Sequence, residues 1–129
     1  MSAHVYPLAK QSFESKLIDL VNDNIKVVAL SSAYTYSATH QFLSDLTGTI
    51  ATTANLSGKS VANGVFSASN TVFSAVAAGS TITQIVGYQD TGVAATSRLV
   101  WINDGFSQAT NGGDINVNWD TGANKIFAL

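Results

Sequence analysis

The side chains that could do acid–base, nucleophilic or metal chemistry are few in this chain and widely spaced. The only histidines are His4 and His40, and neither has an acidic or histidine neighbour at the i+4 spacing of a helical metal site. We expect His4 on a mobile terminus and His40 half exposed in a short helix. The chain has no cysteine and no Gly-x-Ser-x-Gly motif. We therefore predict that the protein is not an enzyme and needs no metal, cofactor or small-molecule substrate.

Four aspartates of the second half of the chain stand at the ends of predicted strands, where carboxylates could bind calcium or cleave a glycosidic bond. They are Asp90, Asp104, Asp114 and Asp120. None belongs to an EF-hand pattern, and aspartate commonly accepts hydrogen bonds from its own backbone at turns. We expect these side chains to stabilise turns.

One short motif resembles a phosphate-binding loop. Gly58-Lys59-Ser60 matches the end of that motif, but Thr53 stands where its first glycine is required. We interpret the match as chance.

The second half of the chain, from Ser80 onward, has the clearest strand patterns. Strands are expected over Ile82 to Gln89, Ser97 to Asn103, Asp114 to Asp120 and Lys125 to Leu129. The third of these alternates strictly, which places three large apolar side chains on one face: Ile115, Val117 and Trp119. We expect the last strand to complete the sheet that the other three form.

The first half mixes strands with short helices. Ile25 to Leu30 is rich in β-branched residues and predicts a strand buried on both sides. Ala9 to Val21 predicts a helix of one or two turns, although Lys16 to Leu20 could instead be a strand. A short helix is also expected over Ala38 to Leu46. The Asn63-Gly64 pair predicts a tight hairpin.

These patterns total eight or nine short strands with turn signals between them. Strands at this spacing indicate an all-β fold with antiparallel sheets, a β-sandwich or a jelly-roll-like barrel, with one or two short helices. At 129 residues, with no linker or repeat, we expect one domain over residues 1–129.

The composition limits the partners. Charged residues make up 11% of the chain against about 25% in average soluble domains, and the net charge is −2. This leaves no basic stripe for nucleic acid, and no apolar stretch is long enough to cross a membrane. We expect a neutral surface suited to packing against neighbouring subunits, in a protein made in the cytoplasm without a cleaved signal.

Aromatic side chains are the best candidates for such contacts, because they are enriched at the centres of protein interfaces. We predict contact roles for Tyr34 and Tyr36 in a loop, for Trp101 in the two-sided apolar run Leu99 to Ile102, and for Phe106.

Several ordered pieces of the chain, taken together, resemble a widespread family of small phage and prophage virion proteins. The pieces are Ile25-Lys26-Val27, His40-Gln41-Phe42-Leu43-Ser44-Asp45, Tyr88-Gln89-Asp90-Thr91-Gly92, Ser97-Arg98-Leu99, Asn111-Gly112-Gly113-Asp114-Ile115, Trp119-Asp120 and Ile126-Phe127. A proline commonly precedes the Asn-Gly-Gly turn in that family, where this chain has Ala109-Thr110, and the N-terminal segment also departs. The resemblance implies a structural role in the virion and no catalytic residues.

From this resemblance we expect a virion-located capsid decoration or cement protein that stabilises the head shell. Its partners would be the major capsid protein and copies of itself, as a dimer or trimer, with no nucleic acid and no membrane. The alternative is a tail, fibre or baseplate component, with host-surface carbohydrate binding as a further possibility.

Overall fold

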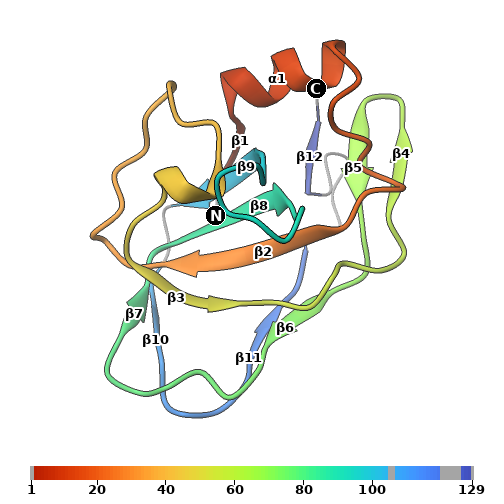
Figure 1. The fold of residues 1–129 in the computed structure, drawn as a ribbon. Helices are drawn as coiled ribbons and strands as arrows, with labels where there is room; N and C mark the ends of the chain where they lie inside the picture. The colour runs from red at the N-terminus through yellow and green to blue at the C-terminus, as the bar shows by residue number, and fades with distance from the viewer. Residues whose placement is uncertain (1, 105–106, 120–125, 129) are drawn as a thin grey trace.

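The computed structural model describes residues 2–104, 107–119 and 126–128, and these form a mainly β fold whose strands all pair antiparallel (Figure 1). The largest sheet has five strands in the order β1-β9-β8-β2-β3. Their bounds are β1 Ser2–Val5, β2 Ile25–Leu30, β3 Thr49–Thr52, β8 Gln84–Gln89 and β9 Leu99–Asp104. The all-β, antiparallel class predicted from the turn spacing is confirmed.

The remaining strands form three small sheets. Three strands lie in the order β12-β5-β4, and the other two sheets are the pairs β11-β6 and β10-β7. Their bounds are β4 Ser60–Ala62, β5 Val65–Ser67, β6 Thr71–Phe73, β7 Thr81–Ile82, β10 Gln108–Ala109, β11 Ile115–Val117 and β12 Phe127–Ala128. The described strands outside the main sheet form three separate small sheets and not one continuous second sheet. A sandwich or jelly roll therefore stays a prediction.

Strand β2 has the predicted bounds, Ile25–Leu30, and lies between β8 and β3. Its β-branched and leucine side chains are buried on both sides of the sheet, as its apolar sequence predicted. Alternate residues enter two separate cores: Val27 and Ala29 face one, and Val28 and Leu30 face the other.

The first core lies between the five-stranded sheet and the small sheets. It contains large side chains from β5, β6 and β12, namely Phe66, Phe73 and Phe127, against Trp101 of β9. The second core lies on the opposite face of the sheet. It is covered by Tyr6 and Ala9 of the helical segment and by Tyr34 of the loop that follows β2. Figure 1 shows the helix above the sheet and the ribbons β6-β11 and β7-β10 below it.

Helix α1 spans Pro7–Glu14, so it begins before the predicted Ala9 and ends well before Val21. Pro7 occupies the first turn, where its missing N–H removes no helical hydrogen bond. Lys16 has a φ of 64°, a left-handed conformation that stops the helix. The alternative strand over Lys16 to Leu20 is wrong, because these residues form a turn and irregular chain.

The helix predicted over Ala38 to Leu46 is also wrong; only the 3₁₀ turn η1, Leu43–Asp45, forms there. Asp45 accepts hydrogen bonds from the backbone N–H groups of Gln41 and Phe42. Phe42 itself is extended and makes a β-bridge with Arg98. This bridge to Arg98, the residue before β9, holds Phe42 in an extended conformation that a helix does not allow.

Three further expectations are corrected by the sheet pairing. The predicted strand Ile82 to Gln89 is divided at Thr83, whose N–H donates to the carbonyl of Leu30, so β7 leaves the main sheet. The C-terminal strand β12 pairs with β5 and not with the main sheet. His4 lies in β1, which pairs with β9, so its segment is not a loose terminus.

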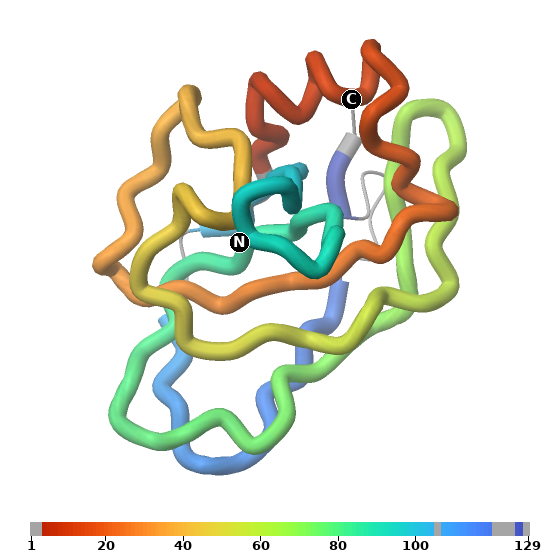
Figure 2. The backbone as a smooth tube through the Cα atoms, in the orientation of Figure 1, coloured from red at the N-terminus to blue at the C-terminus, as the bar shows by residue number. Residues whose placement is uncertain are grey.

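The chain from β6 to β7 runs beside the chain from β10 to β11 as one bent two-stranded ribbon, traced at the bottom of Figure 2. Between the two paired ends, Val76 exchanges backbone hydrogen bonds with Gly112 and Gly113. Thr110 bonds Ser80 through both its backbone and its hydroxyl. The bend divides the ribbon into two arms, the β6-β11 pair and the β7-β10 pair. Strands β10 and β11, which are neighbours in sequence, therefore lie in different arms.

Candidate functional site

Of the residues predicted to make contacts, Trp101 lies in the first core and Tyr34 in the second. Trp101 is 0% exposed and its ring lies within 6.0 Å, centre to centre, of three other core rings: Phe66, Trp119 and Phe127. The small sheets of the chain itself cover this side chain, so it does not reach the surface. Phe106 lies outside the described residues.

Tyr34 is also buried, which removes it as a surface contact, whereas Tyr36 is 40% exposed. The Tyr34 hydroxyl lies 2.8 Å from the hydroxyl of Tyr6 and 2.7 Å from Nδ1 of His40. The Tyr36 ring lies 5.2 Å from the Tyr6 ring. These four side chains form one cluster that joins the second core to the surface, and Tyr36 is its exposed member.

The hydroxyls of Tyr6 and Tyr34 act in this cluster as hydrogen-bonding groups. Burial raises the pKa of Tyr6 far above its ordinary value, with a further rise from its hydrogen bond to Tyr34. Burial also raises the pKa of Tyr34. Both hydroxyls therefore stay protonated, and they link α1 to the 31–46 segment as hydrogen-bonding groups. His40 is half buried, as predicted, but lies in irregular chain and not in a helix.

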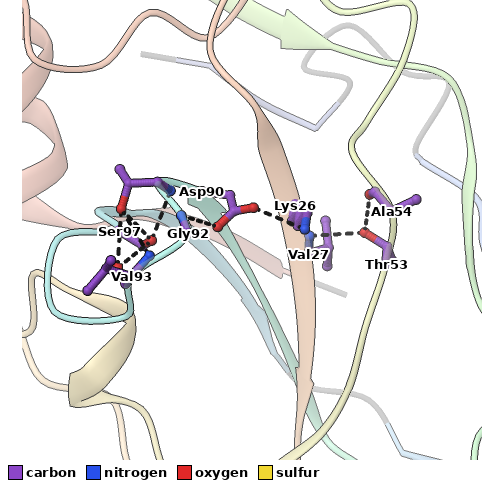
Figure 3. A network of polar contacts seen from close by, with 9 residues as sticks. Lys26, Val27, Thr53, Ala54, Asp90, Gly92, Val93 and Ser97 are labelled. Atoms are coloured by element: carbon purple, nitrogen blue, oxygen red, sulfur yellow. Dashed lines mark hydrogen bonds and ion pairs between the residues drawn. The ribbon is translucent and has the colours of Figure 1, made fainter.

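The loop between β8 and β9 is held by many hydrogen bonds (Figure 3). The carbonyl oxygen of Val93 accepts from the backbone N–H groups of Thr96 and Ser97 and from the Ser97 hydroxyl. The hydroxyls of Thr91 and Thr96 lie 2.6 Å apart and also reach this carbonyl. The Val93 side chain is 57% exposed, so a fixed loop presents it to solvent.

Asp90 fixes the first end of this loop. Its carboxylate accepts the N–H of Gly92 at 3.0 Å and pairs with Lys26 of β2 at 3.0 Å. These contacts, first the hydrogen bond from Gly92 and then Lys26, lower the pKa of Asp90. The turn role predicted for Asp90 is confirmed.

Asp104 and Asp114 make contacts in different parts of the fold. Asp114 accepts the N–H of Ala75, which ties the two strands of the bent ribbon together next to the β6-β11 pair. Asp104 lies 4.0 Å from His4 across the β1-β9 pair. Asp120 lies outside the described residues. Within the described part of the chain, no group of three histidine or acidic side chains could hold a metal ion.

A pocket of about 320 Å³ lies between the two arms of the bent ribbon. Its apolar lining comes from five side chains of both arms and of β8: Phe73, Ile82, Ile85, Ile115 and Val117. Three polar residues complete the lining: Gln108, Asn116 and Asn118. All three are exposed to solvent. The described lining holds no ionisable side chain, so it can bind an uncharged group but offers no acid or base.

Sequence reasoning did not find this pocket. The alternation of Ile115 and Val117 with Asn116 and Asn118 predicted a strand over Asp114 to Asp120 with one wet face, and of this range Ile115–Val117 forms strand β11. What makes the pocket is the bend between Val76 and Ser80, which turns one ribbon into two arms. A bend of this kind leaves no periodic signal in the sequence.

None of the helices that the structure describes is long and apolar enough to span a membrane. Comparison with known proteins gives no match: no family model fits the chain, and no curated protein or solved structure is significantly similar to it.

Proposed function

We propose that this protein is a structural accessory of a phage particle that binds the assembled head shell as a decoration or cement protein. The resemblance of its sequence pieces to virion proteins motivates the proposal. The structural observation that supports it is the hydrogen-bonded 90–97 loop, which presents the exposed apolar side chain of Val93. A loop that is fixed before binding loses little conformational entropy in a complex.

The surface around this loop is suited to a neutral contact. Lys26 and Asp90 pair with each other, and the guanidinium of Arg98 lies 5.7 Å from the centre of the Phe42 ring. The charges beside the loop are thus engaged within the chain. An uncharged apolar contact of this type binds weakly alone, and an oligomer that engages several symmetry-related sites on a shell at once binds more strongly.

Co-sedimentation with emptied, mature shells tests the proposal. The purified protein should pellet with the shells, and should not pellet with unassembled capsid protein. Val93→Glu should weaken the binding about tenfold or more, because it places a charge in the contact. Val61→Glu is the matched control, since Val61 is 48% exposed on β4. Binding to tails alone would overturn the head assignment.

The alternative proposal is a tail, fibre or baseplate component that binds host-surface carbohydrate. The feature in its favour is the pocket, whose lining includes the uncharged polar residues Gln108, Asn116 and Asn118. Pelleting with purified tails or with cell-surface polysaccharide, and not with shells, would support it.

A further inference from the structure

Two Asn-Gly pairs occur in this chain, Asn63-Gly64 and Asn111-Gly112. Asparagine is a thermolabile residue, because the backbone nitrogen of the next residue can attack its side-chain carbonyl carbon without an enzyme. Glycine in the next position has no side chain to hinder this attack. All four residues are exposed, so water and base reach both pairs. Exposure therefore does not distinguish the two pairs, and their backbone hydrogen bonds do.

The first pair forms the tight turn between β4 and β5. Ala62 and Val65 flank it as a register pair, and φ is 52° at Asn63 and 80° at Gly64. Positive φ at both central residues is characteristic of the type I′ turn, whose hydrogen bond joins only the two outer residues. In the described part of the chain, the Gly64 N–H donates no hydrogen bond. The nitrogen that would attack Asn63 is therefore free.

The second pair lies in the bent ribbon, where hydrogen bonds hold both reacting groups. The N–H of Gly112 donates to the carbonyl oxygen of Val76 at 2.8 Å. The side-chain Oδ1 of Asn111 accepts the N–H of Gly113 at 3.0 Å. Attack by the Gly112 nitrogen on the Asn111 side chain requires the bond to Val76 to break first. The same dipeptide is thus free in the hairpin and held in the ribbon.

We propose that Asn63 is a site of spontaneous deamidation and that hydrogen bonds protect Asn111 from the same reaction. Base removes the proton of the Gly64 N–H, and the nitrogen attacks Cγ of Asn63. A C–N bond forms, the bond from Cγ to Nδ2 breaks, and the amide nitrogen takes up a proton and leaves as ammonia. Water then opens the cyclic imide, which gives aspartate or isoaspartate at position 63. This inference is independent of the proposed function.

Both products change the hairpin. Each adds a negative charge to a chain whose net charge is −2. Isoaspartate also routes the backbone through the side-chain carbons, which adds a methylene group to the turn. That turn sets the register of Val61 opposite Phe66, and Phe66 packs in the first core and pairs with Phe127 of β12. The isoaspartate form should therefore loosen the hairpin and lower the melting temperature of the protein.

The test follows both pairs in one sample of the intact chain during incubation in mildly alkaline buffer. Trypsin cuts after lysine and arginine, which puts the two pairs in separate fragments, Ser60–Arg98 and Leu99–Lys125. Mass spectrometry detects the mass gained when an amide becomes a carboxylate, and fragment spectra assign the residue. In the folded protein Asn63 should react about tenfold faster than Asn111, or more, because Asn111 must first lose a hydrogen bond. In guanidinium chloride at the same pH the two rates should be similar, since glycine follows both residues.

Two variants test the effect on the hairpin. Asn63→Gly cannot deamidate, and Gly-Gly also suits this turn. After the same incubation, the melting temperature of the parent should fall and that of Asn63→Gly should not. Fresh Asn63→Asp carries the charge without the added backbone atom, and aspartate tolerates a left-handed turn position. It should melt close to the fresh parent.

Equal rates at the two asparagines in the folded protein, or a faster reaction at Asn111, would overturn the proposal. The same rate ratio in guanidinium chloride as in the folded protein would also overturn it, because the hydrogen bonds would then not be the cause. If the incubated parent and the incubated Asn63→Gly lose equal stability, the effect assigned to the hairpin is wrong.

Discussion

Gly87 of β8 and Trp101 of β9 lie directly opposite each other in the main sheet. They are register partners in the β8-β9 pair, and the Trp101 ring fills the space where another residue at position 87 would have its Cβ. A Cβ at Gly87 would lie 2.1 Å from a ring carbon of Trp101. The tryptophan can lie flat against the sheet only because residue 87 has no side chain.

Gly87→Ala should therefore destabilise the protein by roughly 1–3 kcal/mol or more, because both the ring and the central strand would have to shift. Urea unfolding followed by tryptophan fluorescence measures this change. Gly113→Ala is a suitable control, since its Cβ would meet only the exposed Asn111 side chain at 3.2 Å. Equal stability of the two variants would contradict the packing.

The hydroxyls of Tyr6 and Tyr34 give a second prediction at this scale. Tyr34→Phe leaves the buried Tyr6 hydroxyl without its partner, which should cost about 1–3 kcal/mol. Tyr6→Phe together with Tyr34→Phe removes both hydroxyls. The double variant should be at least as stable as Tyr34→Phe alone in thermal or urea unfolding. Additive losses would mean that the two hydroxyls act independently.

Asp90 gives a pH dependence. Its pKa in the folded protein is lowered by the Gly92 N–H and by Lys26, so its contribution to stability is complete above the ordinary aspartate pKa of about 4. The contribution is lost as the pH falls through the lowered, folded-state pKa. Asp90→Asn should thus reduce the free energy of unfolding at pH 7 and have less effect near pH 2.

Unfolding in urea at both pH values, with and without 1 M NaCl, checks the cause. Salt screens the exposed part of the Lys26 pair and leaves the Gly92 hydrogen bond largely intact. The difference between the parent and Asp90→Asn at pH 7 should persist in salt. If that difference is the same at pH 7 and pH 2, the role given to Asp90 is wrong.

At the scale of elements, strands with strong local signals were predictable and their partners were not. Ile25–Leu30 was found with its correct bounds from β-branched residues alone. The Asn63-Gly64 hairpin was also found, and both residues have the positive φ values, 52° and 80°, that its tight turn requires. Both signals are carried by adjacent residues.

Elements whose form depends on distant partners were missed. Phe42 is extended because it bridges to Arg98, a contact that no pattern within Ala38 to Leu46 encodes. Trp101 was expected at a surface because its strand is apolar on both faces. In this fold the small sheets cover one face of the strand and the helical segment covers the other, so the chain itself buries the strand on both faces. The pocket depends on the ribbon bend and had no sequence signal.

The C-terminal strand β12 gives the prediction at this scale. Ile126 and Phe127 are each 4% exposed and belong to the first core, so deleting residues 125–129 should remove roughly 1.5–3 kcal/mol for each of these two side chains. Against a total stability of about 5–15 kcal/mol, the truncated chain should unfold or melt far below the parent. Circular dichroism measures the melting temperature of both chains. If the truncated chain melts cooperatively within a few degrees of the parent, this packing is contradicted.

At the scale of the whole molecule, the low charge content governs how the protein can associate. Charged residues are 11% of the chain, yet five large apolar side chains among the described residues are at least 40% exposed: Leu17, Val21, Tyr36, Val61 and Val93. A molecule with this surface gains little from electrostatic attraction and more from apolar contact. The proposed attachment to a shell would use contacts of this kind.

The central claim is that this protein attaches to assembled head shells through an uncharged, apolar contact. The most direct measurement is the fraction of protein that co-sediments with emptied mature shells at 0.1 M and at about 1 M NaCl, where the screening length falls from about 10 Å to 3 Å. The account predicts strong binding that is retained at the higher salt concentration. No binding to shells, or binding that is lost at the higher salt concentration, would contradict it.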